Sequence, residues 1–415
     1  MATAISSAKN DAAEIITRDK GQKGLTGDDG IDGAGFNQVR QSLLDSPLCR
    51  LFAPNDIAPV VAGSLTATRA TTGTYIDRYG IVKTASADEM REESEGWLIE
   101  GESTNLILSS EEITVSAGWE ARDGATPVYP LSPAPNGTNT FTRVSSTQPN
   151  AYMREVISNS TAANFTFSIW VKSPSSDRDI NLKLRNLVSD NNSIDQDFTA
   201  TSEWQRLSIT LNSLASTLIV DIKNIAANLA IDYWGAQLEQ QSGPSSYIPT
   251  TTAPVTRAAD LITAQFNNNA TKMGSNHTIV CNFDIGFFDS FNRIFQMDNN
   301  TNDSGTTENV VVNETGRLFY TNRNDTLLFN FENGFNLNSS FALVVKNNQA
   351  SMYVNGVGDD ENPALLTSTN DPNPTTLRLG SRPGGGVNLN GHLKDFRIYD
   401  FALNEDEIKY LSGVV

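Results

Sequence analysis

Apolar and polar residues alternate strictly along several stretches in the middle of the chain. The clearest stretch is 165–172, in which every second position is apolar: Phe165, Phe167, Ile169 and Val171. Side chains two residues apart lie on one face of a strand, so these four predict a core-facing side and place Trp170 on the opposite side. The stretches 207–211 and 229–233 follow the same pattern. Many short strands separated by turn clusters predict two packed antiparallel sheets.

A second alternating region follows a Thr/Pro-rich break at 249–254. Its first predicted strand has apolar residues at alternate positions, namely Ile279, Cys281 and Phe283. Asn355-Gly356 directly follows another such run and predicts a tight hairpin. The predicted fold class is therefore mainly β, with two antiparallel β-sandwich (jelly-roll) domains.

A short helix is predicted at the C-terminal end. Asn404 suits its N-cap, and Glu407 follows three residues later, as in a capping box. Leu403 and Ile408 have the spacing of a hydrophobic staple across this helix start.

Near the N-terminus, glycine recurs at every third position. The glycines in register are Gly21, Gly24, Gly27, Gly30 and Gly33. This spacing predicts a collagen-type triple helix, because three extended chains around one axis leave no room there for a Cβ atom. The tract is short and lacks proline, so alone it would melt. The alternative is a flexible acidic glycine-rich linker.

The residues before this tract carry the a/d spacing of two coiled-coil heptads: Ile5, Ala8, Ala12 and Ile15. A short helical trimer there would hold one end of a triple helix in register. Together the two patterns predict a homotrimer. The alternative is a frayed amphipathic helix, or a helix that docks into another protein.

These patterns divide the chain into five predicted parts. They are an N-terminal attachment and trimerisation helix at 1–20, a collagen-like stalk at 21–35, a connector of short strands and turns at 36–110, a β-sandwich at 111–255 and a jelly roll at 256–415.

Charge and composition restrict the partners. The 415 residues have a net charge of -18 with only 30 Lys and Arg, which argues against a nucleic-acid partner because phosphates would require basic residues. The sequence shows no signal peptide and no run of ~20 apolar residues, so we expect a soluble protein made in a cytoplasm and not inserted in a membrane. Cys49 and Cys281 lie far apart in sequence, and we expect both to be reduced.

Candidate catalytic chemistry is sparse in the sequence. His277 and His392 are isolated, without Cys or His at metal-ligand spacing, so no zinc site, triad or cofactor is predicted. Paired carboxylates of a glycosidase are harder to exclude, but no alternating acidic strand motif is present. Asp359 and Asp360 could bind calcium, although a solvated acidic loop is the favoured interpretation. We therefore predict no catalytic residues and no metal.

Several short motifs follow one another between about residues 65 and 260. They are Thr68–Gly80, Trp97–Gly101, Thr104–Leu106, Gly118-Trp119, Phe165–Lys172, Trp204–Arg206, Trp234–Glu239, Ser246–Thr250 and Val255–Asp260. Together they resemble a segment common in tail-fibre and other virion proteins of bacteriophages, with its carbohydrate-binding β-sandwich. The stretch Gly391–Ile408 resembles the closing strand and helix of concanavalin A-like (laminin-G-like) jelly rolls.

The resemblance implies a homotrimeric fibre on a virion surface, synthesised in a host bacterial cytoplasm. Its N-terminus would attach to a capsid or tail protein, and its β-sandwiches would bind host surface polysaccharide without catalysis. One alternative is a head fibre or capsid decoration protein with accessory glycan binding. The other is an enzyme, a depolymerase that degrades capsule.

The predicted glycan site lies on the outer face of the first sandwich. The strand pattern puts residues of sugar-binding types there: Trp170, Arg206, Asp232 and Trp234. Aromatic faces stack on sugar C–H groups, and Arg and Asp form directional hydrogen bonds with hydroxyls. The alternative, weighted at least equally, is that loops or a neighbouring subunit cover this face.

Overall fold

The chain was analysed as a computed structural model. It describes residues 49–52, 65–158, 161–187, 192–265, 276–288, 291–299, 308–313, 315, 317–322, 325–330, 338–359, 363–366 and 374–412. The predicted N-terminal helix with Ile5, Ala8, Ala12 and Ile15, the glycine tract from Gly21 to Gly33, and Asp360 lie outside these residues.

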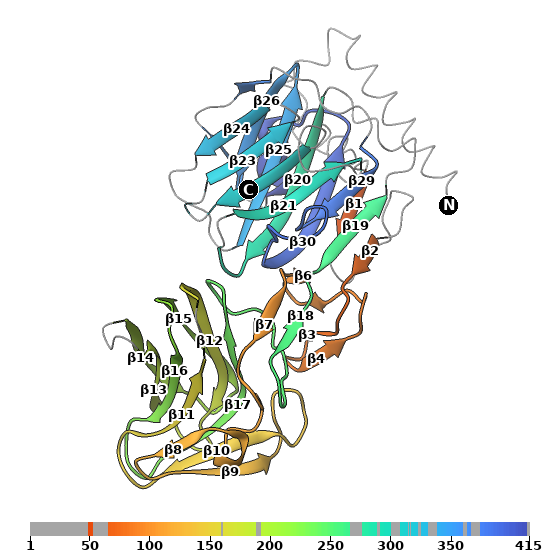
Figure 1. Cartoon of the computed structure of the whole chain (residues 1–415). Helices are drawn as coiled ribbons and strands as arrows, with labels where there is room; N and C mark the ends of the chain where they lie inside the picture. The colour runs from red at the N-terminus through yellow and green to blue at the C-terminus, as the bar shows by residue number, and fades with distance from the viewer. Residues whose placement is uncertain are drawn as a thin grey trace.

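The described chain is mainly β, as predicted, and forms two sandwiches (Figure 1). The first consists of two five-stranded antiparallel sheets. One has the order β15 (Gln205–Ser213), β12 (Ala163–Lys172), β17 (Ala230–Glu239), β10 (Phe141–Ser146) and β9 (Ala125–Leu131). The other has the order β14 (Ser193–Ala200), β13 (Arg178–Asn186), β16 (Leu218–Asn224), β11 (Ala151–Ile157) and β8 (Glu120–Arg122). A 3-10 turn, η1 (Val115–Ala117), precedes β8.

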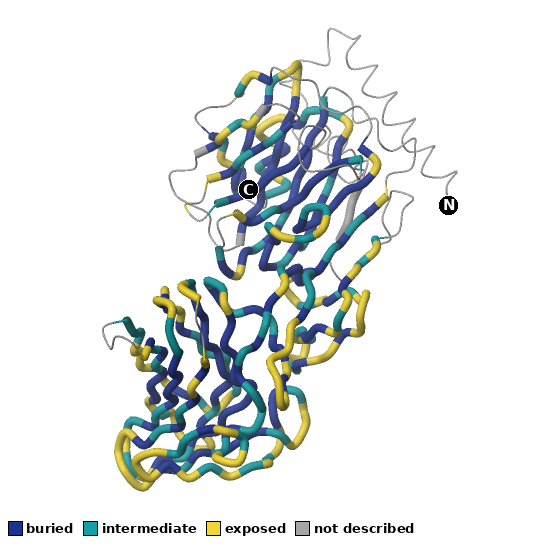
Figure 2. Tube along the Cα trace, viewed as in Figure 1, coloured by how far each residue is buried: buried dark blue, intermediate teal, exposed yellow. Residues whose placement is uncertain are grey.

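The core of the first sandwich follows the alternation read from the sequence. The predicted inward residues of β12 are all fully buried in it: Phe165, Phe167, Ile169 and Val171. They pack with Trp119, Leu182 and Val220 among others. Figure 2 shows buried residues concentrated along the strands of both sandwiches.

The second sandwich has a nine-stranded and a seven-stranded sheet. The main path of the larger is β27 (Val357–Gly358), β26 (Gln349–Val354), β25 (Asn338–Lys346), β20 (His277–Ile285), β30 (Gly391–Tyr399), β6 (Gly96–Ile99) and β5 (Glu92–Glu93). Off this path, β1 (Cys49–Phe52) pairs with β30 and β28 (Ala364–Leu365) with β26. The smaller is β2 (Leu65–Thr68), β19 (Leu261–Gln265), β29 (Thr376–Leu379), β21 (Phe291–Asp298), β22 (Glu308–Asn313), β23 (Arg317–Asn322) and β24 (Asp325–Asn330).

This topology corrects the expectation of a separate connector at 36–110. Strands β1, β2, β5 and β6 from that segment pair within the two sheets of the second sandwich, and Trp97 and Ile99 of β6 are part of its core. The physical reason is that strands of two to four residues are not stable alone and complete the edge of an existing sheet. The first sandwich is thus inserted between two parts of the second.

Two small elements lie between the sandwiches (Figure 1). Strands β3 (Gly73–Ile76) and β4 (Val82–Ala85) form a hairpin, which we call the junction hairpin. Strand β7 (Ser103–Asn105) leads into the first sandwich and pairs with β18 (Val255–Arg257), which leaves it. Entry and exit strands are therefore held side by side.

The local predictions for the C-terminal part are confirmed. Helix α3 (Glu405–Leu411) has the full capping box, in which the Asn404 side chain accepts from the Glu407 N–H and the Glu407 carboxylate accepts from the Asn404 N–H. Leu403 and Ile408 are buried in one cluster. Asn355-Gly356 forms the turn between β26 and β27, with φ values of 49° and 78°. No helix in the described ranges is long and apolar enough to cross a membrane.

Candidate functional site

The outer face of the first sandwich is covered by other segments of the chain around Trp170 and Trp234, and is not an exposed glycan-binding surface there. Trp170 and Trp234 do point away from the main core, as strand parity predicted. However, they are only 5% and 0% exposed, because Val82 of the junction hairpin, Ala134, Phe141 and Tyr247 pack over them. Their rings lie in edge contact, with centroids 5.2 Å apart. This face is a second small core.

Two of the four predicted glycan-binding residues are not placed for a ligand. The Asp232 carboxylate accepts two hydrogen bonds from the Arg143 guanidinium, from Nε at 2.6 Å and from Nη2 at 2.9 Å. The Trp234 indole N–H donates to the Thr140 hydroxyl at 3.0 Å. Buried polar groups require such partners, and here the chain itself supplies them. The predicted roles of Asp232 and Trp234 are corrected accordingly.

Trp170 and Arg206, in contrast, line a pocket of about 190 Å³. The Arg206 guanidinium lies over the Trp170 ring, 4.3 Å from its centroid. It donates to the Ser245 carbonyl at 2.6 Å and to the Ser168 hydroxyl at 2.9 Å. Among the described residues, its Nε has no hydrogen-bond partner. Burial lowers the pKa of Arg206, and the charges of Glu239 and Glu100 partly oppose this, so the guanidinium stays protonated.

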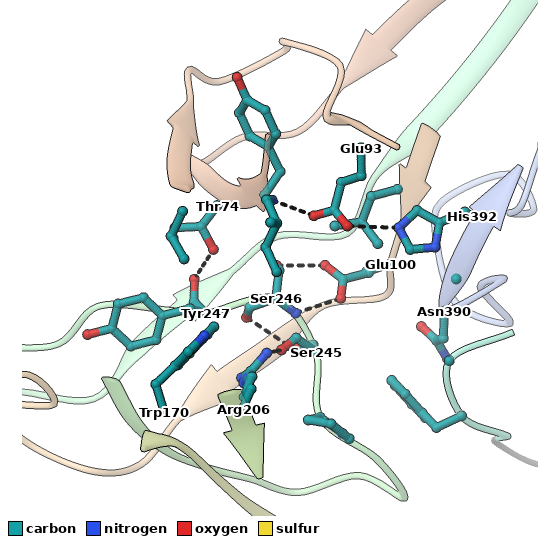
Figure 3. A pocket seen from close by; sticks show the side chains of 18 residues that line it. Thr74, Glu93, Glu100, Trp170, Arg206, Ser245, Ser246, Tyr247, Asn390 and His392 are labelled. Atoms are coloured by element: carbon teal, nitrogen blue, oxygen red, sulfur yellow. Dashed lines mark hydrogen bonds and ion pairs between the residues drawn. The ribbon is translucent and has the colours of Figure 1, made fainter. Parts of the chain in front are cut away.

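This junction pocket is built by four parts of the chain (Figure 3). The first sandwich provides Trp170 and Arg206, and the segment after β17 provides Ser245, Ser246 and Tyr247. The junction hairpin provides one side with Thr74, Tyr75, Ile76 and Val82. The edge of the second sandwich closes the other side, and its polar residues here are Glu93, Asn390 and His392.

His392 is held between two carboxylates at the edge of this pocket. Its Nδ1 lies 3.0 Å from Asp284 Oδ1, and its Nε2 lies 3.0 Å from Glu93 Oε2. Burial by itself lowers the pKa of His392, but the hydrogen bonds and charges of Asp284 and Glu93 outweigh it and raise the pKa to about 9. His392 is therefore an imidazolium at neutral pH. Glu93 Oε1 also accepts from the Ile76 N–H at 2.6 Å, which ties the junction hairpin to this edge.

A buried ionic network lies behind the pocket. Glu100 contacts Arg91 at 2.7 Å and Arg257 at 3.4 Å, while Asp260 binds both Arg91 and Arg69. Burial raises the pKa of Glu100, but Arg257, Arg91 and hydrogen bonds from Ser246 outweigh it and hold this pKa well below its usual range. Glu100 is thus permanently ionised and cannot serve as a general acid.

Five residues of this network lie in the short sequence motifs 68–80, 97–101, 246–250 and 255–260: Arg69, Glu100, Ser246, Arg257 and Asp260. Arg91 lies outside these motifs. A further motif residue, Asn105, binds the carbonyls of Ala236 and Ile248 and so joins β7 to the segment that leaves the first sandwich. The motifs therefore encode the junction between the sandwiches. The pairing of His392 with Glu93 was missed, because nothing in the sequence links residues 299 positions apart.

A second pocket, of about 290 Å³, is lined in part by β3 and β4. Threonine residues dominate its wall: Thr71, Thr72, Thr74, Thr84 and Thr256. It shares Thr74 and Tyr247 with the junction pocket. Its hydroxyl groups can exchange hydrogen bonds with polar molecules, but it holds no cation apart from the buried Arg257.

Comparison with known proteins finds a family for one part of the chain. Residues 263–409 match the family model described as the concanavalin A-like lectin/glucanases superfamily, so this part of the second sandwich is similar to concanavalin A-like domains. No curated protein sequence matches the chain.

Solved structures match parts of this chain at low similarity. One is the NanB sialidase of Streptococcus pneumoniae, at 16% identity and TM-score 0.28, covering 33% of this chain and 24% of that one. The Ruminococcus gnavus IT-sialidase CBM40 has 17% identity and TM-score 0.29, covering 33% and 83%. The binding domain of Botulinum neurotoxin DC, solved with rat synaptotagmin II, has 17% identity and TM-score 0.30, covering 38% and 40%. This chain thus spans about a quarter of the NanB sialidase chain.

Proposed function

We propose that this protein is a non-catalytic glycan-binding adhesion protein whose ligand enters the junction pocket. The observation that carries the proposal is the Arg206–Trp170 stack in a pocket that also presents Ser245, Ser246 and Asn390. An aromatic edge, a planar cation and hydroxyl or amide groups are the combination that binds sugar rings and their hydroxyls. At about 190 Å³ the pocket is smaller than typical drug-sized sites, which suits one saccharide unit of a longer chain.

The carboxylates of the pocket support binding rather than hydrolysis. A glycosidase needs two carboxyl groups, one of them a protonated acid. Glu100 is locked as an anion by Arg91 and Arg257, and Glu93 is engaged by His392 and the Ile76 N–H. Neither group is placed as a free acid. We therefore expect no bond cleavage.

We further propose that the protein works as a homotrimeric fibre on a bacteriophage virion. The glycine triplets, the preceding heptads and the motif resemblance support this setting. The N-terminal helix would attach to a capsid or tail protein, and the sandwiches would face the host surface polysaccharide. Three weak sites on a fibre reinforce each other by raising the effective concentration. Sedimentation of the intact protein should give about three times the 45.0 kDa chain mass, whereas a monomer at micromolar concentration would refute the fibre.

The binding proposal is tested with purified full-length protein and polysaccharide from the host surface. The variant Arg206→Met keeps an apolar stem against Trp170 but removes the charged donors, and it should weaken binding about 10-fold or more. Arg178→Met on β13, at a residue that does not line the pocket, is the matched control and should bind like the parent. Circular dichroism checks that both variants fold. Equal binding by Arg206→Met and the parent would contradict the proposal, and release of oligosaccharides would indicate a depolymerase.

A further inference from the structure

Three metal-ligating side chains gather at one edge of the nine-stranded sheet. Glu93 is the last residue of β5, Glu95 lies in the turn to β6, and His392 is the second residue of β30. The β30–β6 and β6–β5 pairings place these segments side by side. One carboxylate oxygen from each glutamate and one imidazole nitrogen all lie within 4.8 Å of one another. Two of the three residues, Glu93 and His392, also line the junction pocket (Figure 3).

The close approach of these strands depends on Gly96. This residue has φ +135°, and a Cβ on it would lie 2.6 Å from the Leu393 carbonyl oxygen. Only glycine allows the β5–β6 turn to pass so near to β30. The three side chains are therefore positioned by paired strands and a tight turn, which give better-defined geometry than a long loop.

The orientation of His392 matches that of a metal-bound histidine. Its ring Nδ1 lies 3.0 Å from Asp284 Oδ1, and the same carboxylate accepts a hydrogen bond from the backbone N–H of His392 at 3.0 Å. This fixes the ring and directs Nε2 to the glutamates. Metal-ligating histidines almost always donate their second ring N–H to a carboxylate, a backbone carbonyl or a water, and Asp284 provides such an acceptor here.

The balance of charge at this edge also favours a cation. Three carboxylates surround one imidazole: Glu93, Glu95 and Asp284. An ion pair of His392 with Glu93 and Asp284 accounts for two of them and does not involve Glu95, which accepts a hydrogen bond from the Ser94 hydroxyl at 2.6 Å. Glu95 therefore distinguishes a metal site from a simple ion pair.

We propose that Glu93, Glu95 and His392 bind a divalent transition-metal ion, which displaces the Nε2 proton of His392 into solvent, with Asp284 as the positioning residue behind His392. One imidazole nitrogen and two carboxylates suit zinc better than calcium or magnesium, which prefer oxygen ligands. Four ligand atoms at about 2.0–2.2 Å from a zinc ion lie roughly 3.4 Å from one another in a tetrahedron. The three atoms here lie within 4.8 Å of one another, so small side-chain rotations bring them to coordinating distance. Three protein ligands leave the fourth coordination position of the ion open. Because Glu93 and His392 line the junction pocket, a hydroxyl group of a ligand bound in the pocket would occupy this position.

The test uses zinc alone, titrated calorimetrically into full-length protein after removal of metals by a chelator. We expect one saturable ion per chain, no comparable binding of magnesium, and tetrahedral absorption bands when cobalt replaces zinc. Glu95→Gln, at an exposed position, should fold normally and bind zinc at least about 10-fold more weakly, and Asp284→Asn should lose about 10- to 100-fold. The matched control is Glu203→Gln, at an exposed position of the first sandwich.

No saturable binding by the parent protein would refute the site. So would equal zinc affinity of Glu95→Gln and the parent, or several weak ions bound alike by every variant. Because no glycan is present in this titration, its outcome is independent of the proposed glycan binding.

Discussion

The two sandwiches differ in how the chain builds them. The first is formed by continuous sequence from β8 to β17, and its core draws on this stretch and the adjoining residues. The second combines β1, β2, β5 and β6 with strands that come after the first sandwich. A domain of continuous sequence can be cut out at its entry and exit, whereas a discontinuous one needs both of its parts. The difference shows that the first sandwich is inserted between two parts of the second, of which residues 263–409 are similar to concanavalin A-like domains.

The largest expected effect comes from cutting the chain at the predicted boundary. A fragment of residues 103–257 retains β7, β18 and the whole core of the first sandwich, and it should melt cooperatively. A fragment of residues 256–415 lacks Trp97, Ile99 and four strands, and it should not fold. Circular dichroism melting of both fragments measures this. A cooperative transition of the 256–415 fragment would show that the N-terminal strands are dispensable.

Breaking the ionic network between the sandwiches should have the next largest effect. Glu100→Gln leaves Arg91 and Arg257 without their shared carboxylate, and removal of one partner from a buried ion pair costs about 3 to 5 kcal/mol of unfolding free energy. Denaturant unfolding measures the loss. Glu120→Gln removes an exposed partner of Arg122 and should leave the melting temperature unchanged. Similar behaviour of the two variants would argue against a stabilising role for the network.

The second sandwich should lose stability at alkaline pH through His392. Against the lowering effect of burial, the contacts with Asp284 and Glu93 raise the pKa of His392 from 6.5 to about 9. The stabilisation that these contacts give the folded state is therefore complete below pH 6.5 and is lost as pH rises through 9. The contribution is at most about 3 kcal/mol. Unfolding free energies measured with chelator from pH 6 to 10 test this. His392→Gln should lack this pH dependence, and an unchanged slope in the variant would assign it to another group.

The first sandwich should also lose stability as pH rises, by a smaller amount, because a buried carboxyl group becomes charged there. Glu155 of β11 points to the core side of its sheet, and its Oε2 has no hydrogen-bond partner among the described residues. Burial, with a smaller contribution from Glu120, raises its pKa to about 7. Stability from the neutral form is complete below pH 4.5 and is lost as pH rises through 7. At pH 8, Glu155→Gln should therefore gain about 1 to 2 kcal/mol after allowance for solvent screening. A destabilised variant would contradict this assignment.

Strand β12 shows how far sequence reasoning reaches. Its alternation correctly assigned Phe167 to the core and Trp170 to the other face. The same reasoning treated that other face as an exposed sugar platform, with loop cover as the alternative. The cover comes from Val82 and Tyr247, about 90 and 80 residues away in sequence, and period-two patterns carry no information on such contacts. Truncation of Trp170 must therefore be expected to cost stability as well as binding.

By itself, the sequence determined the features that depend on neighbours along the chain. These include the mainly β class, the inward faces of strands, the hairpin at Asn355-Gly356 and the capped helix after Asn404. They follow from side-chain alternation and from hydrogen bonds spanning a few residues. The tertiary structure decided that the early strands complete the second sandwich and that Arg69, Glu100 and Asp260 form one network. It also brought Glu93 to His392, because strand pairing and burial of charge join residues whose separation in sequence sets no pattern.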